Sequence, residues 1–249
     1  MNAGTKGSPH HFDQELSALK EKLITMGTLA EGAVRRSMKA LLDRDDIIAR
    51  RAKEDDEVLD ELEIEIDEVS INLLTKAPLA SDLRLITVAM KISQNLERVG
   101  DEATTIARRA LELNSEPQLK PYVDIPRMAD IALQMLKEAL DAFVTRDPVR
   151  ARAVIPRDKE VDALNKQLHR ELVSYVIESP PRISRCLNLM VVSKSLERIA
   201  DHATNVAEEV VYLYEGRDIR HTGKKAGQAL GTGAADASVE QKTPPPLRP

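Results

Sequence analysis

Apolar residues recur along most of this 249-residue chain at alternating spacings of three and four positions. One such stripe runs from Ala89 to Ala110, and a second, at the same seven positions plus one hundred, runs from Leu189 to Val210. These spacings place side chains on one face of an α-helix, and a stripe sustained over three heptads is typical of a helix packed lengthwise in a bundle. The pattern therefore predicts an all-α protein built from long helices.

Helix-breaking residues divide this pattern into six elements. The expected helices span residues 12–43, 46–76, 81–114, 125–146, 148–178 and 181–215. We expect Asp45 and Ser81 to act as N-caps, Pro156 to kink the fifth helix and Gly216 to end the last one. Because the connections are short, consecutive helices should be antiparallel neighbours.

The second half of the chain repeats the first. The segment LERVGDEAT at 96–104 returns at 196–204 as LERIADHAT, with six of nine positions identical. Earlier in each half, at an offset of 102, Asp56 matches Asp158 and Asp60 matches Asp162. Shared register over this length indicates a tandem duplication. We therefore expect two three-helix bundles, at residues 12–116 and 124–216, followed by a disordered tail at 217–249.

Charge and composition narrow the functional classes. The net charge is −5, but residues 217–249 hold six Lys or Arg against three Asp or Glu, so the preceding body carries −8. An acidic body with only 2% aromatic residues disfavours nucleic-acid binding. Cys186 is the single cysteine, which excludes an intrachain disulfide, and no apolar run is long enough to span a bilayer. We expect a cytoplasmic protein that does not cross the membrane.

Each copy carries two pairs of carboxylates spaced four residues apart. The pairs are Asp56 with Asp60, Glu97 with Asp101, Asp158 with Asp162, and Glu197 with Asp201. This spacing places both acids of a pair on one helix face, beside the apolar stripe. If the second and third helices of a copy pack antiparallel, four carboxylates converge on one groove, where repulsion calls for solvent or a cation. All-oxygen ligands suit Mg²⁺, Mn²⁺, Ca²⁺ or iron.

Other interpretations of these acids remain open. Carboxylates on a charged helix commonly form a solvated face, and Arg98 and Arg198 are placed to neutralise part of the charge. Ferritin-like dimetal sites need a histidine three residues after the glutamate, where this chain has Gly100 and Ala200, so redox oxygen chemistry is disfavoured. No phosphate-binding loop, GxSxG or HExxH motif occurs. Three hypotheses follow: a metal-binding regulator, a metal-dependent hydrolase or oxidoreductase, and a purely structural adaptor.

The doubled motif resembles the hallmark of the PhoU family, the phosphate-specific transport accessory proteins. The matching strings are LERIADHATN at 196–205, and ASDLR at 80–84 followed by LERVGD at 96–101. The resemblance covers about residues 12–215. It implies two PhoU bundles in a cytoplasmic, non-enzymatic negative regulator of phosphate uptake and the phosphate-starvation response. In this role the protein would couple the ATPase subunit of a phosphate ABC transporter to a sensor histidine kinase, often as a homodimer.

The same resemblance implies bound metal ions, which could be Mg, Mn, Fe or Zn. Its motifs give as ligands Glu97, Asp101, Glu197 and Asp201, with Asp56, Asp60, Asp158 and Asp162 as further candidates. Glu102 stands where the second copy has His202, which predicts that the two sites differ in metal preference.

Overall fold

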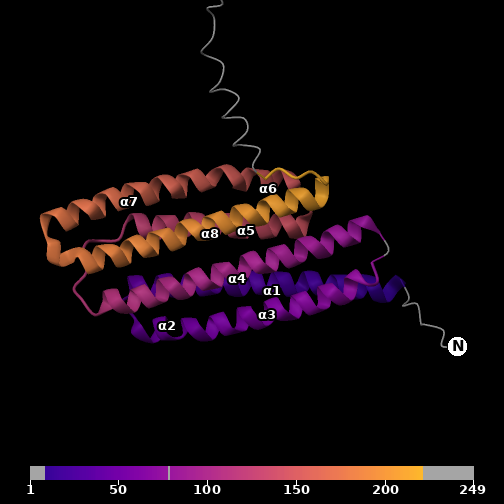
Figure 1. Cartoon of the computed structure of the whole chain (residues 1–249), viewed down its shortest axis with the longest axis horizontal. Helices are drawn as coiled ribbons and strands as arrows, with labels where there is room; N and C mark the ends of the chain where they lie inside the picture. The colour runs from indigo at the N-terminus through magenta and orange to yellow at the C-terminus, as the bar shows by residue number, and fades with distance from the viewer. Residues whose placement is uncertain (1–8, 78, 221–249) are drawn as a thin grey trace, which may run out of the picture. The chain divides into compact units, whose positions relative to one another are not determined.

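The computed structural model describes residues 9–77 and 79–220, and the structural statements that follow concern those residues. The described part is all-α and contains no strand, as the periodicity predicts (Figure 1). The first copy comprises α1 (Pro9–Leu42), α2 (Asp46–Arg50), α3 (Ala52–Leu74) and α4 (Ala80–Asn114). The second copy comprises α5 (Asp124–Thr145), α6 (Pro148–Val154), η1 (Ile155–Arg157), α7 (Asp158–Glu178), η2 (Pro180–Arg182) and α8 (Ile183–Glu215). Most of the expected tail, residues 221–249, lies outside the described residues.

Each copy is a bundle of three long helices that meet along the predicted stripes. In α4 the residues Leu96, Val99 and Ile106 are fully buried, and Leu196 and Ile199 are equally buried in α8. Burying an aliphatic side chain of this size contributes about 1.5–3 kcal/mol relative to leaving it exposed. The heptad stripes therefore form the cores of the two bundles.

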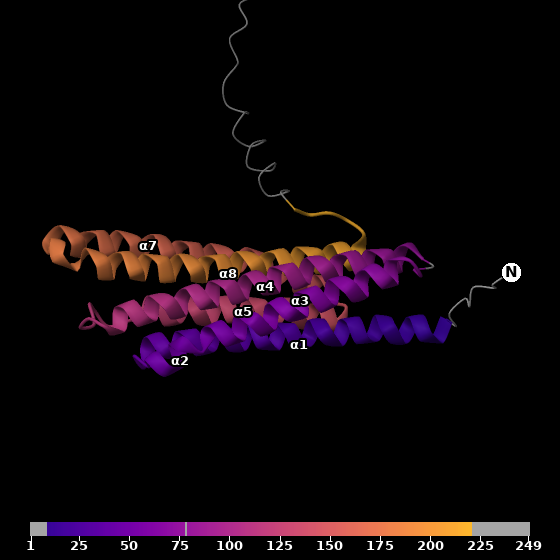
Figure 2. The same ribbon diagram turned by 60° about the horizontal axis from the view of Figure 1, so that its bottom comes forward.

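The two copies pack side by side through α4 against α8 and α1 against α5, and the described residues up to Asp218 form one compact unit (Figure 2). Contacts across α4 and α8 step in opposite directions along the two helices, so these helices are antiparallel. The contacts are Lys91 with Glu209, Asn95 with Asn205, and Glu102 with Arg198.

Helix ends and breaks depart in part from the expected elements. Asp45 is an N-cap as predicted, and its carboxylate accepts hydrogen bonds from the backbone N–H groups of Ile47 and Ile48. The prediction of Ser81 as an N-cap is wrong: the extended residue before α4 is Leu79, and Ser81 already lies within the first helical turn. An N-cap needs non-helical backbone, so the hydroxyl of Ser81 is too late in the chain to serve as one.

Two expected helices are interrupted near their starts. In the second copy Pro156 lies in η1, between α6 and α7, as the sequence predicts. In the first copy α2 ends before Arg51 without any proline, which the sequence did not reveal. The N–H of Arg51 bonds to the carbonyl of Ile48, three residues back, at 3.3 Å. Gly216 ends α8 in the left-handed conformation at φ 66°, as expected.

Candidate functional site

In the first copy the predicted carboxylates gather between α3 and α4. Burial raises the pKa of Asp56, and the negative charges of Asp60 and Asp101 raise it further. Burial and the charge of Asp101 raise the pKa of Glu97 to about 7, although Arg98 opposes the shift. As anions these side chains therefore repel one another across the groove between the two helices.

Gly100 allows α3 and α4 to approach closely at this point. A Cβ atom added to Gly100 would lie 2.5 Å from Cδ1 of Leu59 and 3.4 Å from Oδ1 of Asp56. The Asp56 carboxylate consequently lies directly beside the α4 backbone, between the positions of Glu97 and Asp101. This is the close approach that the glycine predicts.

In the second copy an equivalent groove lies between α7 and α8. Burial raises the pKa of Asp158, with further contributions from the charges of Asp162 and Glu197. Burial, followed by the charges of Asp158 and Glu197, raises the pKa of Asp201 to about 6, and Lys194 opposes this. The structure thus brings the four predicted acids of each copy together in one groove.

Basic side chains compensate part of this charge. Arg98 Nη1 lies 2.9 Å from Asp101 Oδ2, and Arg98 Nε lies 3.3 Å from Glu97 Oε2. Lys194 forms an ion pair with Glu197. Arg198 does not serve its own groove, because it forms an ion pair with Glu102 of the other copy at 3.0 Å. Of the two arginines expected to neutralise the acid pairs, only Arg98 does so.

The grooves also contain buried acceptor atoms without a hydrogen bond. In the described residues these include Glu97 Oε2, Glu197 Oε2 and Asp158 Oδ1, although Arg98 and Lys194 approach the first two within ion-pair distance. A buried carboxylate oxygen that makes no hydrogen bond is unstable unless a cation compensates it. The donor set therefore fits a hard cation. No three Asp, Glu, His or Cys side chains of the described residues are already grouped as a metal site, so binding would require side-chain rotation.

Glu102 and His202 lie outside both grooves. The Glu102 carboxylate accepts a hydrogen bond from Arg198, and His202 Nδ1 lies 3.0 Å from Oδ1 of Asn95, both across the interface between the copies. Burial lowers the pKa of His202, although Glu102 opposes this shift. Neither residue is therefore placed as a metal ligand, because one step along a helix turns the side chain by about 100°. The difference in metal preference between the two sites stays a prediction.

The first groove contains two acids, Glu63 and Asp67, that the repeated motif does not predict. Glu63 lies on the same face of α3 as Asp60, and its pKa is raised by burial and then by the charges of Asp67 and Asp60. The signal was present as acids at i+3 and i+7 from Asp60. The duplication does not mark these acids, because the second copy has Asn165 and His169 at these positions. There, Ser193 donates a hydrogen bond to Asn165 and lies 3.1 Å from His169 Nε2.

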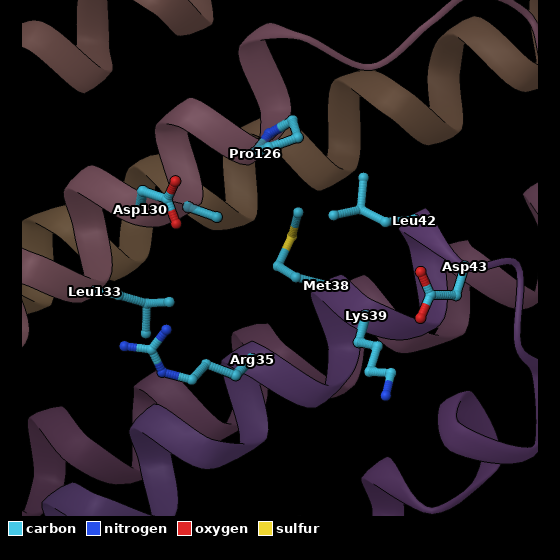
Figure 3. A pocket seen from close by; sticks show the side chains of 9 residues that line it. Arg35, Met38, Lys39, Leu42, Asp43, Pro126, Asp130 and Leu133 are labelled. Carbon is cyan, nitrogen blue, oxygen red and sulfur yellow. The ribbon is translucent and has the colours of Figure 1, made fainter.

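A hollow of about 290 Å³ lies between α1 and α5, away from the acid grooves (Figure 3). Its floor is apolar and its rim carries both charge signs, and Arg35 on the rim is bound to Glu31 at 2.6 Å. The hollow lies where the two copies differ. Met38 and Ala129 line it, whereas the residues at the equivalent positions, Leu140 for Met38 and Gly27 for Ala129, pack tightly against each other. A second hollow of about 230 Å³ adjoins the first groove and includes Glu63 and Asp67.

None of the described helices is both long and apolar enough to cross a membrane. The fold and the grooves together give two acid-lined helical bundles joined along α4 and α8.

Comparisons with known proteins agree with this architecture. The PhoU domain matches the chain twice, at residues 23–110 and 125–210. A Pseudomonas putida protein described as a phosphate-specific transport system accessory protein PhoU homolog is 42% identical over 236 residues, covering 92% of each chain. A Pseudomonas aeruginosa homolog of the same description is 42% identical and covers 86% of this chain and 91% of its own.

Solved structures extend the likeness to the whole fold. The crystal structure of PhoU from Pseudomonas aeruginosa has a TM-score of 0.80 at 42% identity, covering 83% of this chain and 100% of that one. The Streptococcus pneumoniae phosphate transport system regulatory protein PhoU has a TM-score of 0.78 at 26% identity, covering 84% and 99%. With its duplicated domain matched twice over most of its length, the chain belongs to the PhoU family.

Proposed function

We propose that this chain is a cytoplasmic regulatory accessory protein of a phosphate transport system. It represses phosphate uptake and the phosphate-starvation response, and it does so by binding rather than by catalysis. The observation that best supports this proposal is the 42% identity, over 92% of both chains, to a protein described as a phosphate-specific transport system accessory protein PhoU homolog. The expected partners are the ATPase subunit of a phosphate ABC transporter, a sensor histidine kinase and a second copy of the chain.

The proposal assigns a cation to each acid groove. In the first groove Glu97, Asp101, Asp56 and Asp60 would hold it, and in the second Glu197, Asp201, Asp158 and Asp162. Raised pKa values at Glu97 and Asp201 support this assignment, because burial and then the charges of neighbouring acids raise them, and a bound divalent ion would offset both effects. When bound, the ion supplies positive charge that draws the two helices of a groove together. Arg98 and Lys194 would then turn away from the acids that they now contact.

Complementation tests the regulatory role. A strain lacking its own regulator and carrying a phosphate-starvation reporter should show high reporter activity in phosphate-rich medium, and this chain should return it to the repressed level. Affinity purification from the same cells should recover the transporter ATPase or the histidine kinase. Unchanged reporter activity, with the chain expressed and folded, would remove the regulatory assignment.

Metal analysis tests the ligand assignment. We expect purified protein loaded with Mn²⁺ or Fe²⁺ to lose about half of its bound metal in the Glu97→Ala/Asp101→Ala variant, because one of two sites is lost. The matched control is Glu61→Ala/Glu65→Ala, which removes two acids at the same spacing from the exposed face of α3. Equal metal content in all three proteins would contradict the assignment and favour a structural adaptor with solvated acids. Phosphatase or oxidase turnover that Glu197→Gln abolishes would instead indicate a metal-dependent enzyme.

A further inference from the structure

The turn between α7 and α8 carries a group of exposed aliphatic side chains, here called the α7–α8 tip. Ile177 is 76% exposed, Leu187 53%, Val173 48% and Ile183 47%. Together they expose on the order of 400 Å² of apolar surface, which matches the largest patches found on typical monomers. Patches of this size commonly mark a binding surface. In Figures 1 and 2 this turn extends past the end of α4.

The four side chains lie on one side of the helix pair. His169 and Ser193, 3.1 Å apart, mark the line along which α7 and α8 meet. At about 100° per residue, Val173 and Ile177 turn away from this line to one side of α7. Because α8 runs antiparallel to α7, Ile183 and Leu187 turn to that same side. The tip is therefore one continuous apolar surface.

The first copy carries a different apolar surface at its equivalent turn, where Leu79, in place of Ser179, is 61% exposed. Two of the four positions stay aliphatic there and two become threonine. Aligned through the duplication, Val173 and Ile183 correspond to Ile71 and Leu83, whereas Ile177 and Leu187 correspond to Thr75 and Thr87. The hydroxyls of both threonines bond to backbone carbonyls of their own helices. Because the two copies share a fold and acid pairs, the two additional aliphatic side chains of the tip are not required by the bundle.

The charges near the two turns also differ, and the second turn is the more basic. Arg170 and Arg182 of the second copy stand where the first copy has Glu68 and Asp82. Among the described residues neither arginine pairs with a carboxylate. Glu178, which replaces Lys76, offsets one of these changes. The α7–α8 tip is thus apolar with free arginines, whereas its counterpart, which exposes Ile71, Leu79 and Leu83, carries acids.

Charge distinguishes among possible occupants better than size does. A standard protein interface buries about 800 Å² on each partner, a little over half of it apolar, so the apolar area of the tip is compatible with a protein or a lipid surface. An anionic lipid surface matches the two arginines, because each nearby Arg gains about 1 kcal/mol at such a membrane while each aliphatic side chain inserts independently. The nearest groove acid, Asp162, precedes Ile177 by fifteen residues, or about 22 Å along α7. At physiological salt the Debye length is about 8 Å, so the groove acids do not repel the lipid, and Glu178 at the tip offsets one of the two arginines.

We propose that the α7–α8 tip docks weakly and reversibly on an anionic phospholipid surface. Ile177, Ile183, Leu187 and Val173 enter the interface, and Arg170 and Arg182 contact lipid phosphates. The inference rests on the proposed function in one respect, since a regulator bound to a transporter works beside a bilayer. A weak lipid contact then adds to the protein contact by raising the effective concentration of the chain at the membrane.

Vesicle flotation of the purified full chain tests this proposal. We expect binding to phosphatidylethanolamine vesicles containing about 30% phosphatidylglycerol to exceed binding to phosphatidylcholine vesicles at least about tenfold, and to weaken with salt. Ile177→Thr/Leu187→Thr introduces the residues of the first copy at exposed positions and should lower binding about tenfold. Arg170→Glu/Arg182→Asp should abolish the preference for anionic lipid. The control Ile64→Thr/Ile71→Thr removes two exposed isoleucines from α3 and should bind as the parent does.

Three results would overturn the inference. They are equal binding to both vesicle types, unchanged binding of the Ile177/Leu187 variant, and a parent dimer that binds no vesicles and that this variant dissociates. The last result would assign the tip to a second copy of the chain. A chain that restores repression without binding vesicles contradicts only this inference, whereas vesicle binding without repression contradicts only the proposed function.

Discussion

Gly100 and Leu59 form a pair whose sizes depend on each other, and this dependence gives a quantitative prediction. A Cβ atom on Gly100 would lie 2.5 Å from Cδ1 of Leu59, much closer than carbon atoms approach in proteins. In the second copy the same two positions hold Ala200 and Val161, both fully buried. Val161 is one carbon smaller than Leu59, and Ala200 is one carbon larger than Gly100, so the two pairs of residues fill the same volume.

The magnitudes follow from this geometry. Gly100→Ala gains about 1 kcal/mol of helix propensity but costs about 1–3 kcal/mol through overpacking against Leu59. Leu59→Val alone removes a buried methylene group and costs about 1 kcal/mol. In the double variant the smaller valine makes room for the new methyl group, so we expect stability at or slightly above that of the parent. The two changes should therefore couple by at least about 1 kcal/mol.

Urea unfolding followed by far-ultraviolet circular dichroism measures the four proteins of this cycle. The mirror cycle in the second copy, Val161→Leu with Ala200→Gly, provides the control and should couple with the same sign. Effects that add within about 0.5 kcal/mol would refute the reasoning, because they would mean that the two side chains do not share one space. Metal content should not change with Gly100→Ala, since the added Cβ lies 3.4 Å from Asp56, an ordinary contact distance.

Three further predictions concern pH, the interface between the copies and the helix ends. Without metal, the free energy of unfolding should fall by about 1–3 kcal/mol as pH rises from about 4.5 to about 7, because folding raises the pKa of Glu97 to about 7 and of Asp201 to about 6. Urea midpoints should show this, Glu97→Gln should flatten the slope, and a midpoint that rises with pH would contradict it. Glu102→Ala should cost about 1 kcal/mol by removing the partner of the half-exposed Arg198, yet leave metal content unchanged; a loss of metal would return Glu102 to the site. Asp45→Ala should cost about 1 kcal/mol and Ser81→Ala less than about 0.5, and equal thermal shifts would contradict the helix starts described here.

The fold was predictable from the sequence because one periodic signal appears twice. The stripes that begin at Ala89 and Leu189 indicate how long each helix is and which face it buries. Because the two stripes repeat the same spacing, each supports the prediction made from the other. The break at Arg51 was not predictable, because no proline or glycine marks it. Similarly, Ser81 has the composition of an N-cap, but the backbone before it already supplies the extended residue. Local chemistry narrows the position of a helix end to a few residues, and tertiary packing selects among them.

The acid grooves were predictable for the pairs that both copies keep, and less so elsewhere. Asp56 and Glu97 were found because Asp158 and Glu197 repeat their spacing. Glu63 was missed because its counterpart is neutral. The positions of Glu102 and His202 were not predictable for a different reason: they adjoin Asp101 and Asp201 in sequence, but their side chains contact the other copy. Adjacent helical residues point about 100° apart, so Asp101 faces α3 while Glu102 faces α8.

The duplication therefore serves as an internal comparison of what each surface requires. The four acid pairs and the buried stripes agree between the copies, which places them among the features common to both bundles. The interface has diverged in a complementary way, because Glu102 pairs with Arg198 whereas His202, at the equivalent position, bonds to Asn95. The tips have diverged as well, since aliphatic residues and arginines of the second stand where the first has threonines and acids. Divergence that the fold does not require is best explained by contacts outside the fold, so the two ends of this protein should have different neighbours.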